Sequence, residues 1–221
     1  MPTFDLLHHT ECIACPLSRT RTHVVPGKGN ITASLAFIGE APGEIEDTEA
    51  APWVGPAGQL LRNMIDAMPG GFESERDFFF SNIYQCRPPD NNIKLADGSP
   101  CPSIWLNAEL QRLRPRVVVA IGQTACHYFR PDDTDMPMRW HASKDNYDEA
   151  HGYWIVGMRH PAAALYAGAE RGSEEGNRII ASMIWSLQRA FYYLVATGTY
   201  APGGDLSKVA ELTEAFEEGG I

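Results

Sequence analysis

The chain has 221 residues, 44% of them hydrophobic, and a formal net charge of −10 from 18 lysines and arginines against 28 aspartates and glutamates. This length suits one sizeable core. No apolar run approaches the roughly 20 residues of a membrane span, and MPTFDLLHHT lacks the pattern of a signal peptide. We therefore expect a cytoplasmic protein that contacts no membrane, and we expect it to be a monomer. The acidic balance argues against nucleic-acid binding over the whole surface but leaves room for a local basic groove.

Four short apolar runs, each ended by turn residues, predict buried strands. They are SLAFIG (34–39), DFFFSNIY (77–84), RVVVAIG (116–122) and GYWIVGM (152–158). Helical periodicity is found in PAGQLLRNMIDAM (56–68), IWLNAELQRLR (104–114), QTACHYF (123–129) and the long run 174–197. Strands that alternate with helices and are apolar on both faces indicate a three-layer αβα fold with a central, mainly parallel four-stranded sheet.

We expect one domain over residues 1–199, followed by a flexible acidic tail over 200–221. The tail holds five acidic residues and one lysine, and its composition does not identify a partner. The segment 131–152 mixes polar and aromatic residues without a clear period, so it is predicted to be a loop.

In open α/β sheets, ligands bind outside the carboxyl ends of the strands. The residues that directly follow the predicted strands are therefore the first candidates for chemistry. These segments are Glu40–Gly43, Asn82–Asn91, Gly122–Thr124 and His160-Pro161. Three of the four carry side chains that could act on a ligand.

The stretch GEAPGEIEDTEAAPWVGPAG (39–58) begins like a phosphate-binding loop and then becomes acidic, where such a loop would present backbone donors and positive charge. Glu40 is either a solvated turn acid or a group that activates water. Glu46 and Asp47 are either surface charges of a loop or members of a carboxylate cluster with tuned pKa values. Trp53 is either a core residue or a platform on which a flat base stacks.

Asn82 and His160 stand near the ends of two other predicted strands. A buried amide must be hydrogen-bonded, and the Asn82 side chain would present one acceptor and one donor side by side. Uracil offers the complementary donor at N3 and acceptor at O4, and cytosine does not. His160 is either structural or a hydrogen-bond donor to a leaving group on which negative charge develops.

Five cysteines in a cytoplasmic chain, with one Cys-x-x-Cys pair, indicate metal or redox chemistry before disulfides. Cys12 and Cys15 form the pair, and Cys86 and Cys101 follow with fourteen residues between them. Four thiolates can enclose either zinc or an iron–sulfur cluster, and spacing alone does not separate the two. Cys126 lies in a predicted helix and is interpreted as a small core residue.

Over about residues 10–190, the chain resembles the family 4 uracil-DNA glycosylases, bacterial and archaeal enzymes that carry a [4Fe–4S] cluster. The similar segments are, in chain order, GEAPGEIEDTEAAPWVGPAGQLL, SNIYQCRPPDNN, VVVAIGQTA and RHPAA. The resemblance implies a DNA repair enzyme that hydrolyses the N-glycosidic bond of deoxyuridine in single- or double-stranded DNA, releasing uracil and leaving an abasic site.

The resemblance also implies roles for individual residues. The residues associated with catalysis are Glu40, Glu46, Asn91 and His160. Uracil would be contacted by Glu40, Ala41, Trp53, Asn82 and His160. The cluster ligands would be Cys12, Cys15, Cys86 and Cys101, with the cluster as a structural clamp and not an oxidant.

Three departures from the family pattern concern substrate range. Ala41 stands where the family usually has glycine, and Trp53 stands where it usually has phenylalanine. HPAAALYAG departs from the common HPS-x-LLR pattern, so the apolar wedge that fills the emptied base stack is expected to be Leu165 or Tyr166. Two other functions are considered beside the glycosylase. One is a DNA-binding protein of the same superfamily that senses uracil or damage, or binds it covalently, without efficient turnover. The other is a small iron–sulfur electron carrier.

Overall fold

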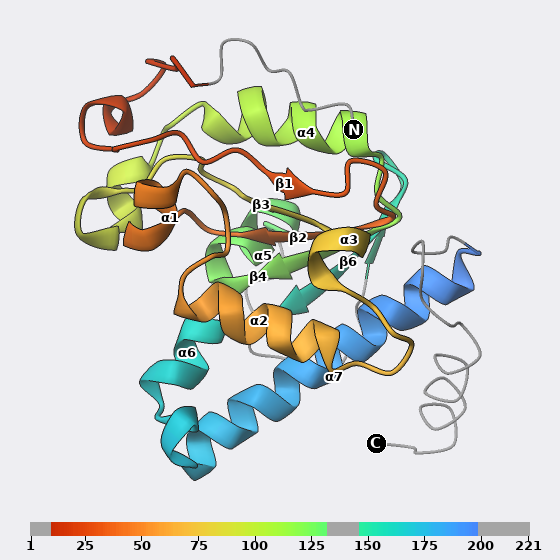
Figure 1. Cartoon of the computed structure of the whole chain (residues 1–221). Coiled ribbons are helices and arrows are strands. Elements are labelled where there is room, and N and C mark those ends of the chain that lie inside the picture. Colours follow the sequence, from red (N-terminus) through yellow and green to blue (C-terminus); the bar gives the residue numbers. More distant parts are fainter. Residues whose placement is uncertain (1–9, 132–145, 199–221) are drawn as a thin grey trace.

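A computed structural model describes residues 10–131 and 146–198, and it places a six-stranded sheet at the centre of the molecule (Figure 1). The strand order is β1-β3-β2-β4-β6-β5. The strands are β1 (Lys28–Gly29), β2 (Leu35–Gly39), β3 (Phe79–Asn82), β4 (Val117–Ile121), β5 (Asn146–Asp148) and β6 (Tyr153–Met158). The four predicted strands form the parallel centre, β3-β2-β4-β6.

The predicted count of four strands is wrong, because β1 and β5 add antiparallel edges. β5 lies in the segment 131–152, which the sequence predicts as a loop. Each edge strand has only two or three residues, too few to show an alternating pattern. The fold class, an α/β sheet between helical layers, is confirmed.

Helices cover both faces of the sheet. The α-helices are α1 (Glu44–Glu49), α2 (Pro56–Asp66), α3 (Ser74–Asp77), α4 (Asn107–Leu113), α5 (Gly122–Phe129), α6 (Pro161–Tyr166) and α7 (Glu174–Ala196). Short 3-10 turns occur at η1 (Pro16–Arg19), η2 (Pro89–Asn91), η3 (Ile93–Ala96) and η5 (Ala169–Arg171), and a π-helical turn at η4 (Pro102–Leu106) leads into α4. The predicted helices 56–68, 104–114, 123–129 and 174–197 correspond to α2, η4 with α4, α5 and α7.

Alternate residues of the central strands enter different cores, as the pleat of a strand requires. Phe37 and Val119 pack with α2, α6 and α7 in the larger cluster, and Ala36 and Val118 pack with α4 and α5 in the other. Figure 1 shows these two helical layers on either side of the sheet. Because both strand faces are buried, the residues free to meet a ligand are those at the strand ends.

Helix α7 is long and apolar enough to cross a membrane by length and composition, but 44% of its most apolar window is buried inside the protein. It contacts α6, β4 and β6, so its apolar face serves the core. The division into a domain at 1–199 and a tail at 200–221 remains a prediction, because residues 199–221 lie outside the described part of the chain.

Candidate functional site

The carboxyl ends of the four parallel strands bring the predicted site segments to one edge of the sheet. Gly39 ends β2 and lies in register with Asn82, the last residue of β3. Gly122 follows β4 and lies against His160, which follows β6. Segments up to 120 residues apart in the chain therefore line one edge, as the sequence predicts.

Asn82 is buried, with 3% of its surface exposed. Among the described residues, none makes a hydrogen bond with its side-chain amide. Buried amides are normally paired, because an unpaired one keeps the full cost of leaving water. The Asn82 donor and acceptor are therefore available to a ligand.

Gly39 is required by close packing at this edge. A Cβ atom at position 39 would lie 2.4 Å from Cζ2 of Trp53 and 2.6 Å from Oδ1 of Asn82. Both distances are well below van der Waals contact, so a side chain would displace the indole ring and the amide together.

For the uracil excision that the family resemblance implies, we therefore expect Gly39→Ala to reduce kcat/KM about 100-fold, since a misplacement of about 1 Å at a reacting site costs this much. Steady-state kinetics on a uracil-containing oligonucleotide measure the effect. Gly71→Ala is the control, because a Cβ there meets open space and only the positive φ of 69° is strained. Equal activity of the two variants would contradict the packing argument.

Trp53 lies at the site but belongs to the core. Its ring is 5% exposed and stacks on His160, with the ring centres 5.6 Å apart. The indole N–H donates to the carbonyl of Ser81 at 3.1 Å, and Arg62 donates to the carbonyl of Trp53 at 3.2 Å. The backbone of Trp53 has a φ of 60°, a strained value for a residue with a side chain. Stacking of Trp53 on uracil stays a prediction.

Glu46 lies on helix α1, where the sequence predicts only a loop. Its Oε1 accepts a hydrogen bond from the backbone N–H of Gly55 at 2.7 Å. The charge of this carboxylate raises the pKa of His160, against the larger lowering effect of burial. Glu46 is thus directed toward the strand ends. The interpretation of Asp47 as a surface charge is wrong, since its side chain is 4% exposed.

Glu40 follows β2 and is half-buried. Its Oε2 accepts a hydrogen bond from the hydroxyl of Thr124 on α5. Its backbone carbonyl accepts from the N–H of Tyr84 at 2.9 Å. The turn that holds Glu40 and Ala41 is therefore fixed to both neighbouring strand ends.

His160 caps helix α6, and its Nδ1 accepts a hydrogen bond from the N–H of Ala162 at 3.2 Å. Because Nδ1 is an acceptor, the neutral ring carries its proton on Nε2. Burial lowers the pKa of His160 to about 4. The ring is therefore a neutral hydrogen-bond donor throughout the physiological pH range.

This low pKa predicts a pH dependence of folding stability. An unfolded histidine has a pKa of about 6.5, so between about pH 4 and 6.5 the unfolded chain binds more protons than the folded chain. Stability should therefore fall as the pH decreases through this window. His160→Asn keeps a capping acceptor and should flatten that part of the profile in urea titrations, whereas His127→Asn, on the exposed face of α5, should leave it unchanged.

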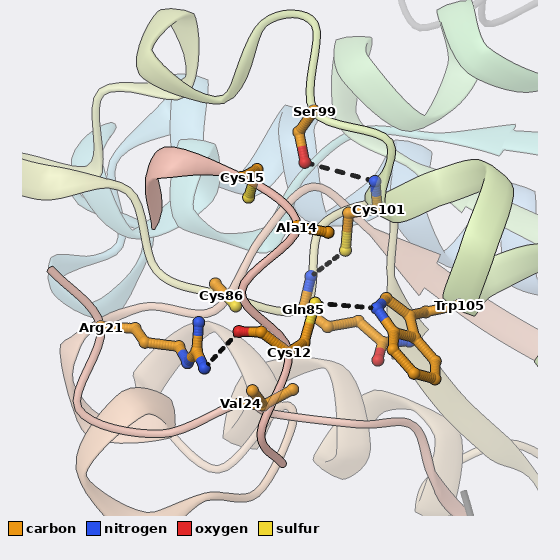
Figure 2. A pocket seen from close by; sticks show the side chains of 10 residues that line it. All are labelled: Cys12, Ala14, Cys15, Arg21, Val24, Gln85, Cys86, Ser99, Cys101 and Trp105. Atoms are coloured by element: carbon orange, nitrogen blue, oxygen red, sulfur yellow. Dashed lines mark hydrogen bonds between the residues drawn. The ribbon is translucent and has the colours of Figure 1, made fainter. Parts of the chain in front are cut away.

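A second site lies beside η1 and η4, where a pocket brings together the four cysteines at 12, 15, 86 and 101 (Figure 2). Two N–H groups point at sulfur: Trp105 Nε1 lies 3.4 Å from Sγ of Cys12, and Gln85 N lies 3.3 Å from Sγ of Cys101. Burial raises the pKa of Cys86 to about 11 and that of Cys101 to about 12. Metal ligation would displace these thiol protons.

The pocket has a donor set that either zinc or an iron–sulfur cluster could use. N–H groups directed at cysteine sulfur are typical of thiolate ligands, whose charge they stabilise. No three His, Cys, Asp or Glu side chains in residues 10–131 and 146–198 are close enough to hold a single metal ion. Cys126, as predicted, lies elsewhere and is buried in the core on the α5 face.

The family model described as the uracil DNA glycosylase superfamily matches residues 26–183 of the chain. The chain belongs to the uracil-DNA glycosylase superfamily. It is 37% identical over 160 residues to the type-4 uracil-DNA glycosylase of Saccharolobus solfataricus, a match that covers 71% of this chain and 73% of the relative. Type-4 enzymes of Archaeoglobus fulgidus and Sulfurisphaera tokodaii are 34% and 40% identical, covering 71% of this chain and 79% and 72% of each relative.

The protein is thus a uracil-DNA glycosylase, a hydrolase of DNA repair. The alternatives of a DNA-binding protein without turnover and of an electron carrier are not supported by these relatives. The residues that the family resemblance singles out lie in two places, at the strand ends and in the cysteine pocket.

Asn91 of this glycosylase lies outside the strand edge. It is exposed, has a φ of 55°, and accepts a hydrogen bond from Nε of Arg87 at 2.9 Å. Arg87 in turn lies 3.6 Å from Glu44 at the start of α1. The structure therefore connects Asn91 to the helix that carries Glu46, and its part in leaving-group stabilisation stays a prediction.

The two wedge candidates differ in exposure. Tyr166 ends α6 with 88% of its surface exposed, and Leu165 is half-buried. An intercalating side chain must be free to enter the base stack. Of the two, Tyr166 fits that requirement better.

Sequence reasoning missed one buried acid near the site, Glu109. It is 1% exposed, accepts hydrogen bonds from the hydroxyl of Ser81 and the N–H of Gly27, and burial raises its pKa to about 7. A signal was present, because Glu109 follows Leu106 by three residues and precedes Leu113 by four, which places it on the apolar face of its helix.

Proposed function

We propose that this glycosylase binds a flipped deoxyuridine with its uracil against Asn82, at the edge bounded by the 40–43 turn, Trp53 and His160. The observation that carries the proposal is that Asn82 is 3% exposed and that no hydrogen bond of the described residues involves its side-chain amide. Such an amide can donate to O4 and accept from N3–H of uracil at once. Cytosine presents an amino group and an acceptor at the same two positions, so it would be rejected. Extruding the nucleotide costs a few kcal/mol, which these contacts offset.

His160 would stabilise the departing base. When the bond between C1′ and N1 breaks, uracil leaves as an anion, and its oxygen atoms take up the charge. A fixed donor aimed at developing charge is among the strongest contributions to catalysis. The neutral Nε2–H of His160, oriented by the bond of Nδ1 with Ala162, can supply that donor. Asn91 would add a second hydrogen bond if its loop closes on the substrate.

Glu46 and Glu40 would act on the sugar. Loss of uracil leaves an oxocarbenium-like deoxyribose, which a nearby carboxylate stabilises while it orients the attacking water. Glu46 suits this role because the Gly55 N–H holds one of its oxygens. Glu40 is held by Thr124 next to the base. Water then adds to C1′, uracil takes up a proton, and an abasic site remains.

We further propose that Cys12, Cys15, Cys86 and Cys101 hold a [4Fe–4S] cluster and not zinc. Four cysteines around one pocket, with N–H groups directed at two sulfurs, support a larger cluster. When bound, the cluster would cross-link the segments that carry the cysteines.

The activity is tested with oligonucleotides that contain one uracil, single-stranded or paired, followed by alkaline cleavage at abasic sites. We expect more than one equivalent of product per protein. A stoichiometric complex with the oligonucleotide, without turnover, would instead support the DNA-binding alternative. The same assay with hypoxanthine or xanthine in place of uracil measures the effect of Ala41 and Trp53 on substrate range.

Tyr166→Ala should separate the wedge from the chemistry. A wedge fills the space that the flipped base leaves in a duplex and has no such space to fill in a single strand. We therefore expect about tenfold slower excision from double-stranded DNA, in line with the few kcal/mol that unstacking a base costs, and little change with single-stranded DNA. Equal losses on both substrates would contradict the wedge assignment.

A further inference from the structure

Helix α1 has one buried side chain, that of Asp47, which binds it to a distant segment of the chain. The helix has six residues, and Asp47 is the only buried one among them. Ile45, which could have packed against a core, is 41% exposed. A helix this short does not form on its own, because nucleation is unfavourable and most helical stability in proteins comes from packing. The position of α1 therefore depends on what Asp47 contacts.

Asp47 contacts the backbone of a distant segment. The N–H of Thr22 donates to both carboxylate oxygens, at 3.0 and 2.9 Å, and the N–H of His23 donates to Oδ1 at 3.0 Å. In the opposite direction, Nδ1 of His23 donates to the backbone carbonyl of Asp47 at 2.8 Å. We call this set of bonds between Asp47 and residues 22–23 the Asp47 clamp.

The two ends of the clamp lead to the two sites. On one side, Glu46 is the residue next to Asp47 and reaches the Gly55 N–H, toward the strand ends. On the other side, Arg21 directly precedes the clamped segment and donates to the carbonyl of Cys12 at 2.7 Å. The clamp thus fixes α1 to the part of the chain that lines the cysteine pocket.

We propose that Asp47 is a positioning residue of this glycosylase, which holds the Glu46 carboxylate at the reacting sugar by clamping α1 to residues 22–23. The inference rests on the proposed role of Glu46. The Asp47 carboxylate is bound to the N–H groups of Thr22 and His23, so it is not assigned a contact with the substrate. Its effect on the reaction is therefore expected to run through the placement of Glu46 alone.

The test is Asp47→Asn, which keeps the size of the side chain but turns one acceptor into an NH2 group that cannot accept from Thr22. Since small displacements of a catalytic group cost up to about 100-fold, we expect kcat to fall by ten- to hundredfold. KM for the oligonucleotide and the visible absorption of the protein should stay within about twofold of the wild type, because neither the DNA contacts nor the cysteines are changed.

Asp77→Asn is the matched control. Asp77 is also fully buried and accepts from a backbone N–H, that of Glu73 at 2.9 Å. It additionally accepts from Nε and Nη2 of Arg76 at 2.8 and 2.7 Å, and it precedes β3, at the amino ends of the parallel strands. The control should lose comparable thermal stability with an unchanged kcat at a temperature where both variants are folded. A similar fall of kcat in both variants would overturn the proposal, because the loss would then be one of stability.

A double-mutant cycle decides whether Asp47 acts through Glu46. Glu46→Gln alone tests the proposed function: unchanged kcat in that variant would remove the role of Glu46, whatever Asp47 does. If Glu46→Gln is slow, adding Asp47→Asn to it should cause no further loss, since the group to be positioned is gone. If the losses of kcat in the two single variants multiply in the double variant, the positioning role is overturned. Loss of visible absorption in Asp47→Asn would also overturn it, because the effect would then come from the cysteine pocket.

Discussion

Asn82→Ala is expected to lower kcat/KM for uracil excision by about two to four orders of magnitude while the fold and the visible absorption persist. The variant removes both hydrogen bonds to the base, and each hydrogen bond to a group that becomes charged contributes about 1.5–3 kcal/mol. Because uracil gains negative charge as it leaves, the loss should appear in kcat as well as in KM. Single-turnover and steady-state kinetics on the same oligonucleotide separate the two contributions.

The control for this prediction is Asn63→Ala, on the exposed face of α2. It removes the same amide from a position in solvent, so its kinetics should match the wild type. If Asn82→Ala also retains full activity, uracil is recognised elsewhere and the proposed orientation of the base is wrong. A lower melting temperature without kinetic loss would show that the buried amide is structural.

The four central strands could be predicted because each is apolar on both faces and ends at turn residues. Parallel pairing brings the carboxyl ends of these strands together, and this predicts from the sequence that Asn82 and His160 lie at one site. The edge strands β1 and β5 could not be predicted, because two or three residues carry no period. Helix α1 was missed for a related reason: four of its six residues are acidic, and its apolar side chain is exposed.

The residues that hold the site together were harder to predict from the sequence than the residues that act in it. The sequence left Asp47 as either a surface charge or a member of a carboxylate cluster, because its partners are backbone N–H groups 24 and 25 residues away, which no local pattern reveals. The sequence left Trp53 as either a core residue or a platform for the base; the structure buries it in the larger core cluster, and its stacking on uracil stays a prediction. Tertiary hydrogen bonds of this kind depend on the folded chain and leave no spacing to detect.

The site at the strand ends and the cysteine pocket are also linked through the backbone. Gln85 donates its backbone N–H to Cys101, and its carbonyl accepts from Val25, two residues beyond the segment that the Asp47 clamp holds. Gln85 follows Asn82 by three residues. Displacement of the cysteine segments would therefore reach both Asn82 along the chain and Glu46 through the clamp.

Cys101→Ser is accordingly expected to abolish the visible absorption and to lower activity by destabilising the fold. If the pocket holds an iron–sulfur cluster, aerobically purified wild-type protein should be brown and contain iron. The variant should be colourless and contain less iron than the wild type. Metal binding to such a pocket contributes directly to folding. Because each kcal/mol of lost stability lowers the melting temperature of a chain of this size by roughly 2–4 °C, we expect the loss of the metal to lower it by more than about 10 °C.

The fifth cysteine supplies the matched control. Cys126 is 1% exposed in the core, and its thiol donates to the carbonyl of Ala120. Cys126→Ser makes the same substitution at a buried site away from the pocket, and a serine hydroxyl can keep that hydrogen bond. It should retain colour, iron and excision. Zinc in place of iron in the wild-type protein, or full colour in Cys101→Ser, would refute the cluster assignment, and the Asn82 prediction would stand independently, because it depends only on the strand edge.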